Sequence, residues 1–219
     1  MHRLQQQILY ALATNKRLRY ARLKPEDVEG NAFMYHLRSL TKLGYIAHAD
    51  EWYHLTPEGQ LFIDQVSLKT FEPRVQPKIV ILMVAQNDSG QILLYRRQRQ
   101  PLINKVGLPY GKLHADETIY EAAARELYKK TGYTGTFNYM SSGTMKIFED
   151  GEMTSYILYT ILKVTEISGD MLGTASSGTP FWSGINAIEQ TELIPSVKDI
   201  LNLGHAEGKN VFVELEYRL

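Results

Sequence analysis

The side chains best suited to chemistry lie between residues 107 and 133, where a loop with proline and glycine leads into a helix rich in alanine and charge. The charged residues of interest there are Glu117, Arg125, Glu126, Lys129 and Lys130. Carboxylates supply the oxygen ligands that Mg2+ requires, whereas lysine has only donors and attracts phosphate by its charge. At about 100° per residue, Glu126 and the two lysines share roughly a third of the helix circumference. One acid and two cations therefore face one place, which favours holding an anion.

The spacing of this segment resembles the signature box of the Nudix family: a glycine, five residues, a glutamate, seven residues, Arg-Glu, an apolar residue, then two acids and a glycine. The residues in register are Gly111, Glu117, Arg125, Glu126, Leu127, Gly132 and Tyr133. In that family, glutamates on the helix hold divalent cations that bridge to the pyrophosphate of a nucleoside-diphosphate-type substrate. Lys129 and Lys130 stand where the resemblance implies acids, which disfavours metal-assisted hydrolysis by that route.

The resemblance implies a structural role for four residues of the box: Gly111, Glu117, Arg125 and Gly132. An ion pair between the glutamate and the arginine would brace the loop. Glu126 is then the box acid left to bind Mg2+ or Mn2+ if the protein is an active hydrolase. The alternative for Glu126 is a salt bridge with Lys130, one helical turn further on, or with Lys129.

Basic side chains in and before the box are candidates to bind a diphosphate. They are Arg96, Arg97, Arg99, Lys129 and Lys130. The planar fork of arginine matches a pair of phosphate oxygens, and a lysine contributes a compact charge. For the three arginines, the alternative is an exposed position at the end of a strand.

Strand and helix patterns on both sides of the box predict an α/β domain over residues 78–219. The predicted strands cover residues 78–85, 91–97, 137–140, 143–148 and 154–164. The first of them is a nearly continuous apolar run, typical of a strand buried on both faces. Closing helices are predicted near 187–189 and 194–201. Alternating apolar residues at 209–219 predict an edge strand suited to pairing with a second subunit. The Nudix resemblance extends from about residue 78 to residue 206.

The first 70 residues follow another pattern, in which helices precede a short hairpin and a last helix. Predicted helices cover residues 3–14, 31–43 and 57–66, and the hairpin covers 45–55. Asn31 and Thr56 are the expected N-caps, and Pro25 is expected to start a further helix. This order resembles a winged helix-turn-helix domain, in which the helix at 31–43 would enter the major groove of DNA.

Polar and basic side chains of this domain are candidates to contact DNA. On the helix they are Asn31, Tyr35, Arg38 and Lys42, and the phosphate-contact candidates before it are Arg17, Arg19 and Arg22. The alternative is a dimerisation or scaffold role, because the acids Glu26, Asp27 and Glu29 lie near the groove-facing side and weaken the attraction to DNA.

Composition sets limits on function. The chain has 219 residues, of which 44% are hydrophobic and 22% charged, with a formal net charge of zero. Any DNA binding must therefore depend on local charge. The absence of cysteine excludes disulfides, thiolate nucleophiles and cysteine-ligated zinc. Neither a signal peptide nor a membrane-spanning segment is expected, which favours a cytoplasmic protein without a membrane partner.

These patterns predict an α+β protein of two domains, a winged helix-turn-helix over 1–70 and a Nudix α/β/α sandwich with a mixed sheet over 78–219, joined by a linker at 71–77. The leading hypothesis is a homodimeric transcription regulator whose catalytically impaired Nudix domain binds a nucleotide or nucleotide-sugar-type diphosphate. One alternative is an active Nudix hydrolase that cleaves a nucleoside diphosphate-linked substrate such as ADP-ribose, with a metal site built from Glu126, Glu121 and acids outside the box. The other alternative is a pure interaction module, in which neither domain retains its ancestral ligand.

Overall fold

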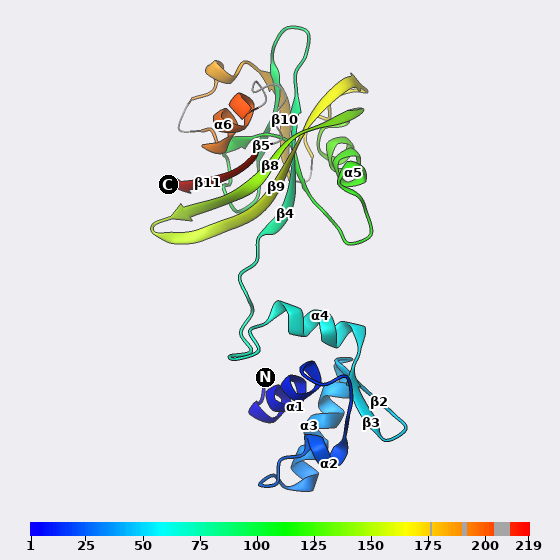
Figure 1. Ribbon diagram of the computed structural model, residues 1–219. Helices are drawn as coiled ribbons and strands as arrows, with labels where there is room; N and C mark the ends of the chain where they lie inside the picture. The colour runs from blue at the N-terminus through cyan, green and yellow to red at the C-terminus, as the bar shows by residue number, and fades with distance from the viewer. Residues whose placement is uncertain (176, 190–191, 204–210) are drawn as a thin grey trace. The chain divides into compact units, whose positions relative to one another are not determined.

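The computed structural model describes residues 1–175, 177–189, 192–203 and 211–219 (Figure 1). The chain divides into two compact units, Met1–Val75 and Gln76–Leu219. Each unit buries its own apolar side chains. Within the described ranges, every helix is too short or too polar to cross a membrane.

The first unit combines four helices with a small antiparallel sheet (Figure 1). The helices are α1 (Arg3–Ala13), α2 (Tyr20–Leu23), α3 (Gly30–Lys42) and α4 (Pro57–Gln65). The strands are β1 (Leu18–Arg19), β2 (Ile46–Ala49) and β3 (Trp52–Leu55), in the order β1-β3-β2. Phe33, Leu37 and Leu40 of α3 are buried in one cluster with Ile8 and Leu9 of α1. Their spacing of three and four residues makes α3 amphipathic and leaves its opposite side exposed.

Two helix ends of the first unit follow their predicted signals. The Thr56 side chain accepts a hydrogen bond from the Gly59 N–H at 3.0 Å, and Pro57 occupies the first turn of α4. Gly44 follows the end of α3 with a φ of 78°, a left-handed conformation that glycine adopts without strain. The hairpin formed by β2 and β3 is also confirmed.

The start of α3 differs from its prediction. Asn31 is not the N-cap, because the helix begins at Gly30 and the cap is Glu29, whose backbone is extended and whose side chain makes no capping bond. Pro25 does not start a helix either. Its carbonyl accepts a hydrogen bond from the Val28 N–H at 3.4 Å, in a turn that connects α2 to α3.

The second unit contains a mixed five-stranded sheet in the order β11-β8-β9-β4-β7. Its strands are β4 (Lys78–Ala85), β7 (Tyr110–Lys112), β8 (Thr134–Glu149), β9 (Glu152–Ser168) and β11 (Phe212–Arg218). The strand β4 runs parallel to β9 and antiparallel to β7, whereas β8 and β9 form a long antiparallel hairpin. A second sheet of order β10-β5-β6 is formed by β5 (Ile92–Arg97), β6 (Val106–Gly107) and β10 (Gly178–Ser183).

Helices α5 (Ile119–Thr131) and α6 (Ser196–Leu203) lie on opposite sides of β4 (Figure 1). Side chains alternate along this strand. Ile81 and Met83 belong to the apolar cluster that contains Leu127 of α5, and Leu82 belongs to the cluster that contains Val197 of α6. The prediction of a strand buried on both faces is confirmed.

Two local predictions for this unit differ from the structure in detail. The residues expected to form separate strands at 137–140 and 143–148 belong to the one strand β8. A register shift between Tyr139 and Ser141 interrupts the regular ladder without ending the pairing with β9. The expected helix at 187–189 is instead a short 3-10 helix, Ile185–Ala187.

The predicted C-terminal edge strand is present as β11, which pairs in parallel with β8 at one edge of the sheet. Pairing with a second subunit stays a prediction, and residues 204–210 of the predicted segments lie outside the described residues. The two strands approach closely at Gly143. An ideal Cβ there would lie 1.8 Å from the Val213 carbonyl oxygen and 2.6 Å from the Tyr159 hydroxyl.

A methyl group at Gly143 should therefore push β11 away from β8. We expect Gly143→Ala to lower the free energy of unfolding by about 1–3 kcal/mol, measured by urea denaturation. Gly173→Ala is the matched control, because a Cβ at that position would meet nothing within 4 Å. Equal urea midpoints for the two variants would show that the edge strand does not depend on this close approach.

Candidate functional site

The ends of α5 fix the position of the box residues. Thr118 is the N-cap: its hydroxyl accepts from the Glu121 N–H at 3.3 Å, and the Glu121 carboxylate accepts from the Thr118 N–H at 2.8 Å. Gly132 ends the helix with a φ of 80°. Between these ends, Glu126 and Lys130 lie one turn apart on the side of the helix that packs against β7.

Arg125 ties this helix to the loop that precedes it. Its Nε and Nη2 atoms donate to the two carboxylate oxygens of Glu117 at 2.8 and 2.6 Å, and Nη2 also donates to the Lys112 carbonyl at 3.0 Å. Glu117 accepts a further hydrogen bond from the His114 N–H at 2.8 Å. These bonds, above all those from Arg125, lower the pKa of Glu117 to about 2. The brace that the box resemblance implies is thus a two-bond fork between charged groups.

Glu126 packs tightly against the backbone of β7. An ideal Cβ on Gly111 would lie 2.3 Å from the Glu126 Cγ, so this approach requires a glycine. The glutamate is buried, its Oε1 is paired with Arg125, and its Oε2 lies 3.5 Å from the Lys130 Nζ. Both carboxylate oxygens therefore face a cation.

The two lysines of the box have different environments. Lys130 is only 7% exposed. Its Nζ donates to the Ser177 hydroxyl at 3.2 Å and lies 4.5 and 5.1 Å from the ring centroids of Tyr110 and Tyr95. Burial lowers the pKa of Lys130, and the neighbouring carboxylate acts in the opposite direction. Lys129 remains exposed.

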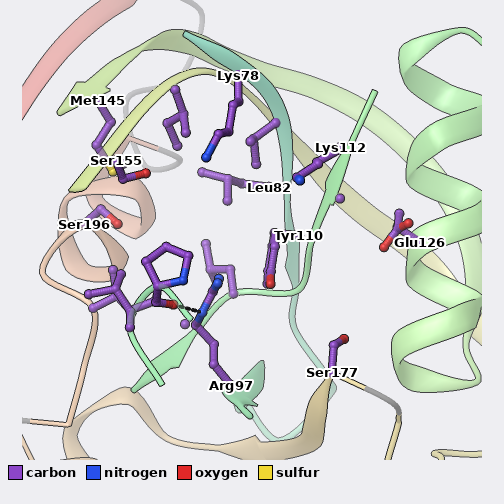
Figure 2. A pocket seen from close by; sticks show the side chains of 18 of the residues that line it. Lys78, Leu82, Arg97, Tyr110, Lys112, Glu126, Met145, Ser155, Ser177 and Ser196 are labelled. Atoms are coloured by element: carbon purple, nitrogen blue, oxygen red, sulfur yellow. Dashed lines mark hydrogen bonds between the residues drawn. The ribbon is translucent and has the colours of Figure 1, made fainter. Parts of the chain in front are cut away.

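These residues border a cavity of about 440 Å³ in the second unit, a size typical of small-molecule sites (Figure 2). Its cationic lining residues are Lys78, Arg97, Arg99, Lys112, Lys129 and Lys130. Within the described part of the chain, Glu126 is the one carboxylate of the lining. Figure 2 shows that Lys78, Arg97 and Lys112 extend into the cavity from β4, β5 and β7. The surplus of positive charge favours an anionic ligand.

The same cavity also has an apolar part. Its apolar lining residues include Leu82, Leu102, Met145, Ile157, Val197 and Ile200. Ser155 and Ser196 supply hydroxyl groups beside Met145 (Figure 2). The cavity therefore matches a ligand that has both a charged and an apolar portion.

A family model described as NUDIX domain matches residues 76–195, more than half of the chain. The chain belongs to the NUDIX family. It is 30% identical over 92 residues to an uncharacterized Nudix hydrolase of Schizosaccharomyces pombe. That match covers 41% of this chain and 43% of the yeast protein, so the chain spans less than half the length of this relative.

Solved structures of NUDIX proteins share the fold of the second unit. A mutator MutT protein from Bacillus halodurans is 23% identical, with a TM-score of 0.51 over 64% of this chain and 90% of its own. The NUDIX domain of Shewanella oneidensis NrtR, crystallised with ADP ribose, is 16% identical, with a TM-score of 0.50 over 68% of this chain and 96% of its own. At these identities the likeness is one of fold.

The NUDIX resemblance implies a divalent cation, but the side chains around Glu126 do not fit one. Among the described residues, His, Asp and Glu form no group of three or more that could hold a metal ion. Arg125 and Lys130 flank the Glu126 carboxylate, and the Glu121 carboxylate is bonded to Thr118 at the start of α5. The two acids of the hydrolase alternative thus belong to separate networks.

The structure separates the three predicted arginines. Arg97 and Arg99 line the cavity, and the Arg97 guanidinium lies 4.5 Å from the ring centroid of Tyr110. Arg96 is not among the lining residues. Its guanidinium pairs with Glu192 at 2.9 Å.

Sequence reasoning missed Lys78, Lys112 and Ser177. The two-residue alternation of β4 was the available signal for Lys78, because it shares a strand face with Val80 and Leu82. Lys112 is brought beside them by its pairing with Val80, a register that spacing along the chain does not reveal. Ser177 precedes β10 and meets Lys130 only through the fold.

The first unit carries a second candidate surface. The predicted DNA-contact residues of α3 are all exposed: Asn31, Tyr35, Arg38 and Lys42. Their spacing places them within about 60° of the helix circumference. Arg17 and Arg19 lie 4.5 and 4.9 Å from the ring centroid of Trp52, and Arg19 also pairs with Glu51 at 3.1 Å. Arg22 is exposed on α2.

The brace should make stability depend on pH. The pKa of Glu117 is lowered from 4.5 to about 2, so its carboxylate stabilises the fold above pH 4.5 and loses that effect as the pH falls toward 2. We expect Glu117→Gln to lower Tm at pH 7, and the difference from the wild type to shrink over that pH window. Thermal melts at each pH measure this difference in Tm. Glu152→Gln is the control, because Glu152 is an exposed glutamate. A difference that stays constant over the window would contradict the role of the charge.

Proposed function

We propose that the chain is a transcription regulator whose NUDIX unit binds a nucleotide or nucleotide-sugar-type diphosphate without hydrolysing it. In this proposal the first unit is a winged helix-turn-helix, and the protein is a homodimer, because paired DNA half-sites require two-fold symmetry. The observation that carries the proposal is the pair of lysines in the box. Lys130 is buried against Glu126, and Lys129 adds its charge to the same cavity.

The charge of the cavity supports a diphosphate ligand. Phosphate oxygens accept hydrogen bonds from arginine and lysine, and Arg97, Lys78 and Lys112 approach the same space from three strands. The apolar part beside Met145 and Val197 suits the uncharged portion of such a ligand. NrtR offers a precedent within the fold, because its NUDIX domain was crystallised with ADP ribose. ADP ribose is therefore the first probe.

Two features of the first unit support DNA binding: the order of its elements and the charge of its surface. The helix α3 precedes the hairpin of β2 and β3, as a recognition helix precedes a wing. The exposed stripe of this helix, made by Asn31, Tyr35, Arg38 and Lys42, offers Arg38 and Lys42 to bases or phosphates. At the hairpin, Trp52 stacks with Arg17 and Arg19, which limits the freedom of these two guanidinium groups to move. A positively charged patch on a neutral protein is what local DNA binding requires.

Fluorescence anisotropy tests the regulatory function directly. A labelled DNA fragment from the region upstream of the protein's own gene is titrated at low salt, with and without ADP ribose. The proposal predicts DNA binding and a ligand-dependent change in affinity of about 5- to 150-fold, the usual range of coupling between two sites. Absence of DNA binding at low salt, unaffected by any nucleotide tried, would refute the regulatory role.

The ligand site has a matched pair of arginines. Arg97→Ala should weaken ADP ribose binding by about 10- to 100-fold, because one charge-assisted hydrogen-bonding group is removed from the cavity. Arg96→Ala removes the same group from the preceding residue, whose side chain is outside the lining. Isothermal titration calorimetry compares the two variants. Equal losses of affinity would place the ligand elsewhere.

The exposed stripe of α3 gives a second test by mutation. Arg38→Ala should weaken DNA binding by about 5- to 100-fold, since each specific contact is worth about 1–3 kcal/mol. Adding Lys42→Ala should weaken it further and reduce the dependence of affinity on salt. Lys163→Ala, an exposed lysine of the second unit, is the control. DNA affinities that do not distinguish Arg38→Ala from this control would exclude α3 as the DNA-contacting helix.

The hydrolase alternative is favoured by one observation, the retained frame of the box in which Glu117, Arg125 and Glu126 keep their places. It would be established by steady release of a phosphate-bearing product from ADP ribose, dependent on Mg2+ or Mn2+ and abolished in Glu126→Gln. The regulatory proposal expects no such turnover.

A further inference from the structure

The ammonium group of Lys130 has contacts of the kind that proteins give to a bound cation. Its Nζ lies 3.5 Å from the Glu126 Oε2 and donates to the Ser177 hydroxyl at 3.2 Å. The faces of Tyr110 and Tyr95 complete its surroundings at 4.5 and 5.1 Å. A carboxylate, a hydroxyl oxygen and two aromatic faces all favour positive charge at this point.

We propose that Lys130 is a built-in cation that replaces the divalent metal at the box glutamate, so that the site holds its anionic ligand without any metal. The disagreement between the family's expected metal ligands and the side chains present is thereby explained. Glu126 serves as the counter-ion that keeps Lys130 charged and in place. The charge that a metal would present to a phosphate is supplied by the chain itself.

Lys130 has this role because of its position, since Lys129 is the same residue type and lacks the same surroundings. Lys129 is its neighbour in sequence and replaces the other expected acid, yet it is exposed. Lys130 lies four residues after Glu126 and therefore faces the same side of α5. Tyr95 fixes the far side of this arrangement, because its hydroxyl shares a 2.8 Å hydrogen bond with Ser177.

A metal ion cannot simply be added to this arrangement. A divalent cation bonded to Glu126 would stand close to both the Lys130 ammonium and the Arg125 guanidinium, which already flank the carboxylate. Repulsion among these charges in a buried place would oppose its binding. Removing the ammonium and adding a carboxylate at the same position should reverse this preference, since hard cations seek several oxygen ligands.

Metal binding without any nucleotide provides the test. Free Mn2+ is measured by electron paramagnetic resonance during titration of the wild type, Lys130→Glu and Lys129→Glu. We expect Lys130→Glu to bind one Mn2+ per chain, and the wild type to bind none at this site. Lys129→Glu should resemble the wild type, because its side chain is exposed and Lys130 would still occupy the place beside Glu126. The double variant Glu126→Gln/Lys130→Glu should lose the acquired Mn2+ binding.

Stability measurements keep the test decisive if the buried substitution weakens the fold. Lys130→Glu places two carboxylates together, so its Tm should be low in EDTA and should rise by several degrees with Mn2+. The wild-type Tm should be the same in both conditions. Wild-type binding of Mn2+ that Glu126→Gln abolishes would overturn the proposal, whatever the folding of the other variants. Equal Mn2+ binding by Lys129→Glu and Lys130→Glu would overturn the assignment to Lys130.

The last measurement rests on the proposed ligand function. The affinity of the wild type for ADP ribose should be equal in EDTA and in Mg2+. A strict requirement for Mg2+ would overturn the replacement of the metal by Lys130. Failure to bind ADP ribose in either condition would count against the proposed function alone, because the Mn2+ titrations use no nucleotide.

Discussion

The second unit depends on burying two opposite charges beside each other. Glu126 and Lys130 are each less than a tenth exposed, and burial of either one alone would carry a large desolvation cost. Their pairing requires three segments at once: α5 supplies both charges, β7 packs Gly111 against the glutamate, and the residue before β10 supplies Ser177. The ring of Tyr110 then lies beside the ammonium and borders the cavity. This wall of the cavity is thus a consequence of satisfying one buried ion pair.

The shape of the box and its charge are separate properties in this protein. Arg125 is about one third exposed, and its fork to Glu117 fixes the loop while a separate nitrogen, Nη1, pairs with Glu126. Gly132 ends the helix by its backbone conformation alone. Exchanging the acids for Lys129 and Lys130 leaves these frame contacts intact. A family likeness in fold can therefore persist while the chemistry of the site is reversed in charge.

Local patterns in the sequence predicted what local physics decides. The apolar run of β4, the glycine that ends α5 and the Thr56 cap depend on neighbouring residues, and each is recognisable in the chain. The start of α3 was mispredicted, because Asn31 satisfies a local capping preference whereas the helix begins at Gly30 after Glu29, which makes no side-chain capping bond. The spacing of four residues within the box predicted the contact between Glu126 and Lys130. The contributions of Lys112 and Ser177 depend on strand register and on a segment far along the chain, which no spacing within the box contains.

The arrangement of the cavity suits the proposed function, in which ligand binding without hydrolysis would carry a signal. Lys78, Arg97 and Lys112 extend into the cavity from three strands, so that like charges share one space. An anionic ligand would offset these like charges and stabilise the bound unit by an amount that rises with the logarithm of the ligand concentration above Kd. A hydrolase consumes the molecule it recognises, whereas the proposed site, with Lys130 in place of a metal, would return it unchanged. The occupancy of such a site would follow the concentration of a metabolite. In the proposed function, a DNA-binding unit in the same chain would convert that occupancy into a change in transcription.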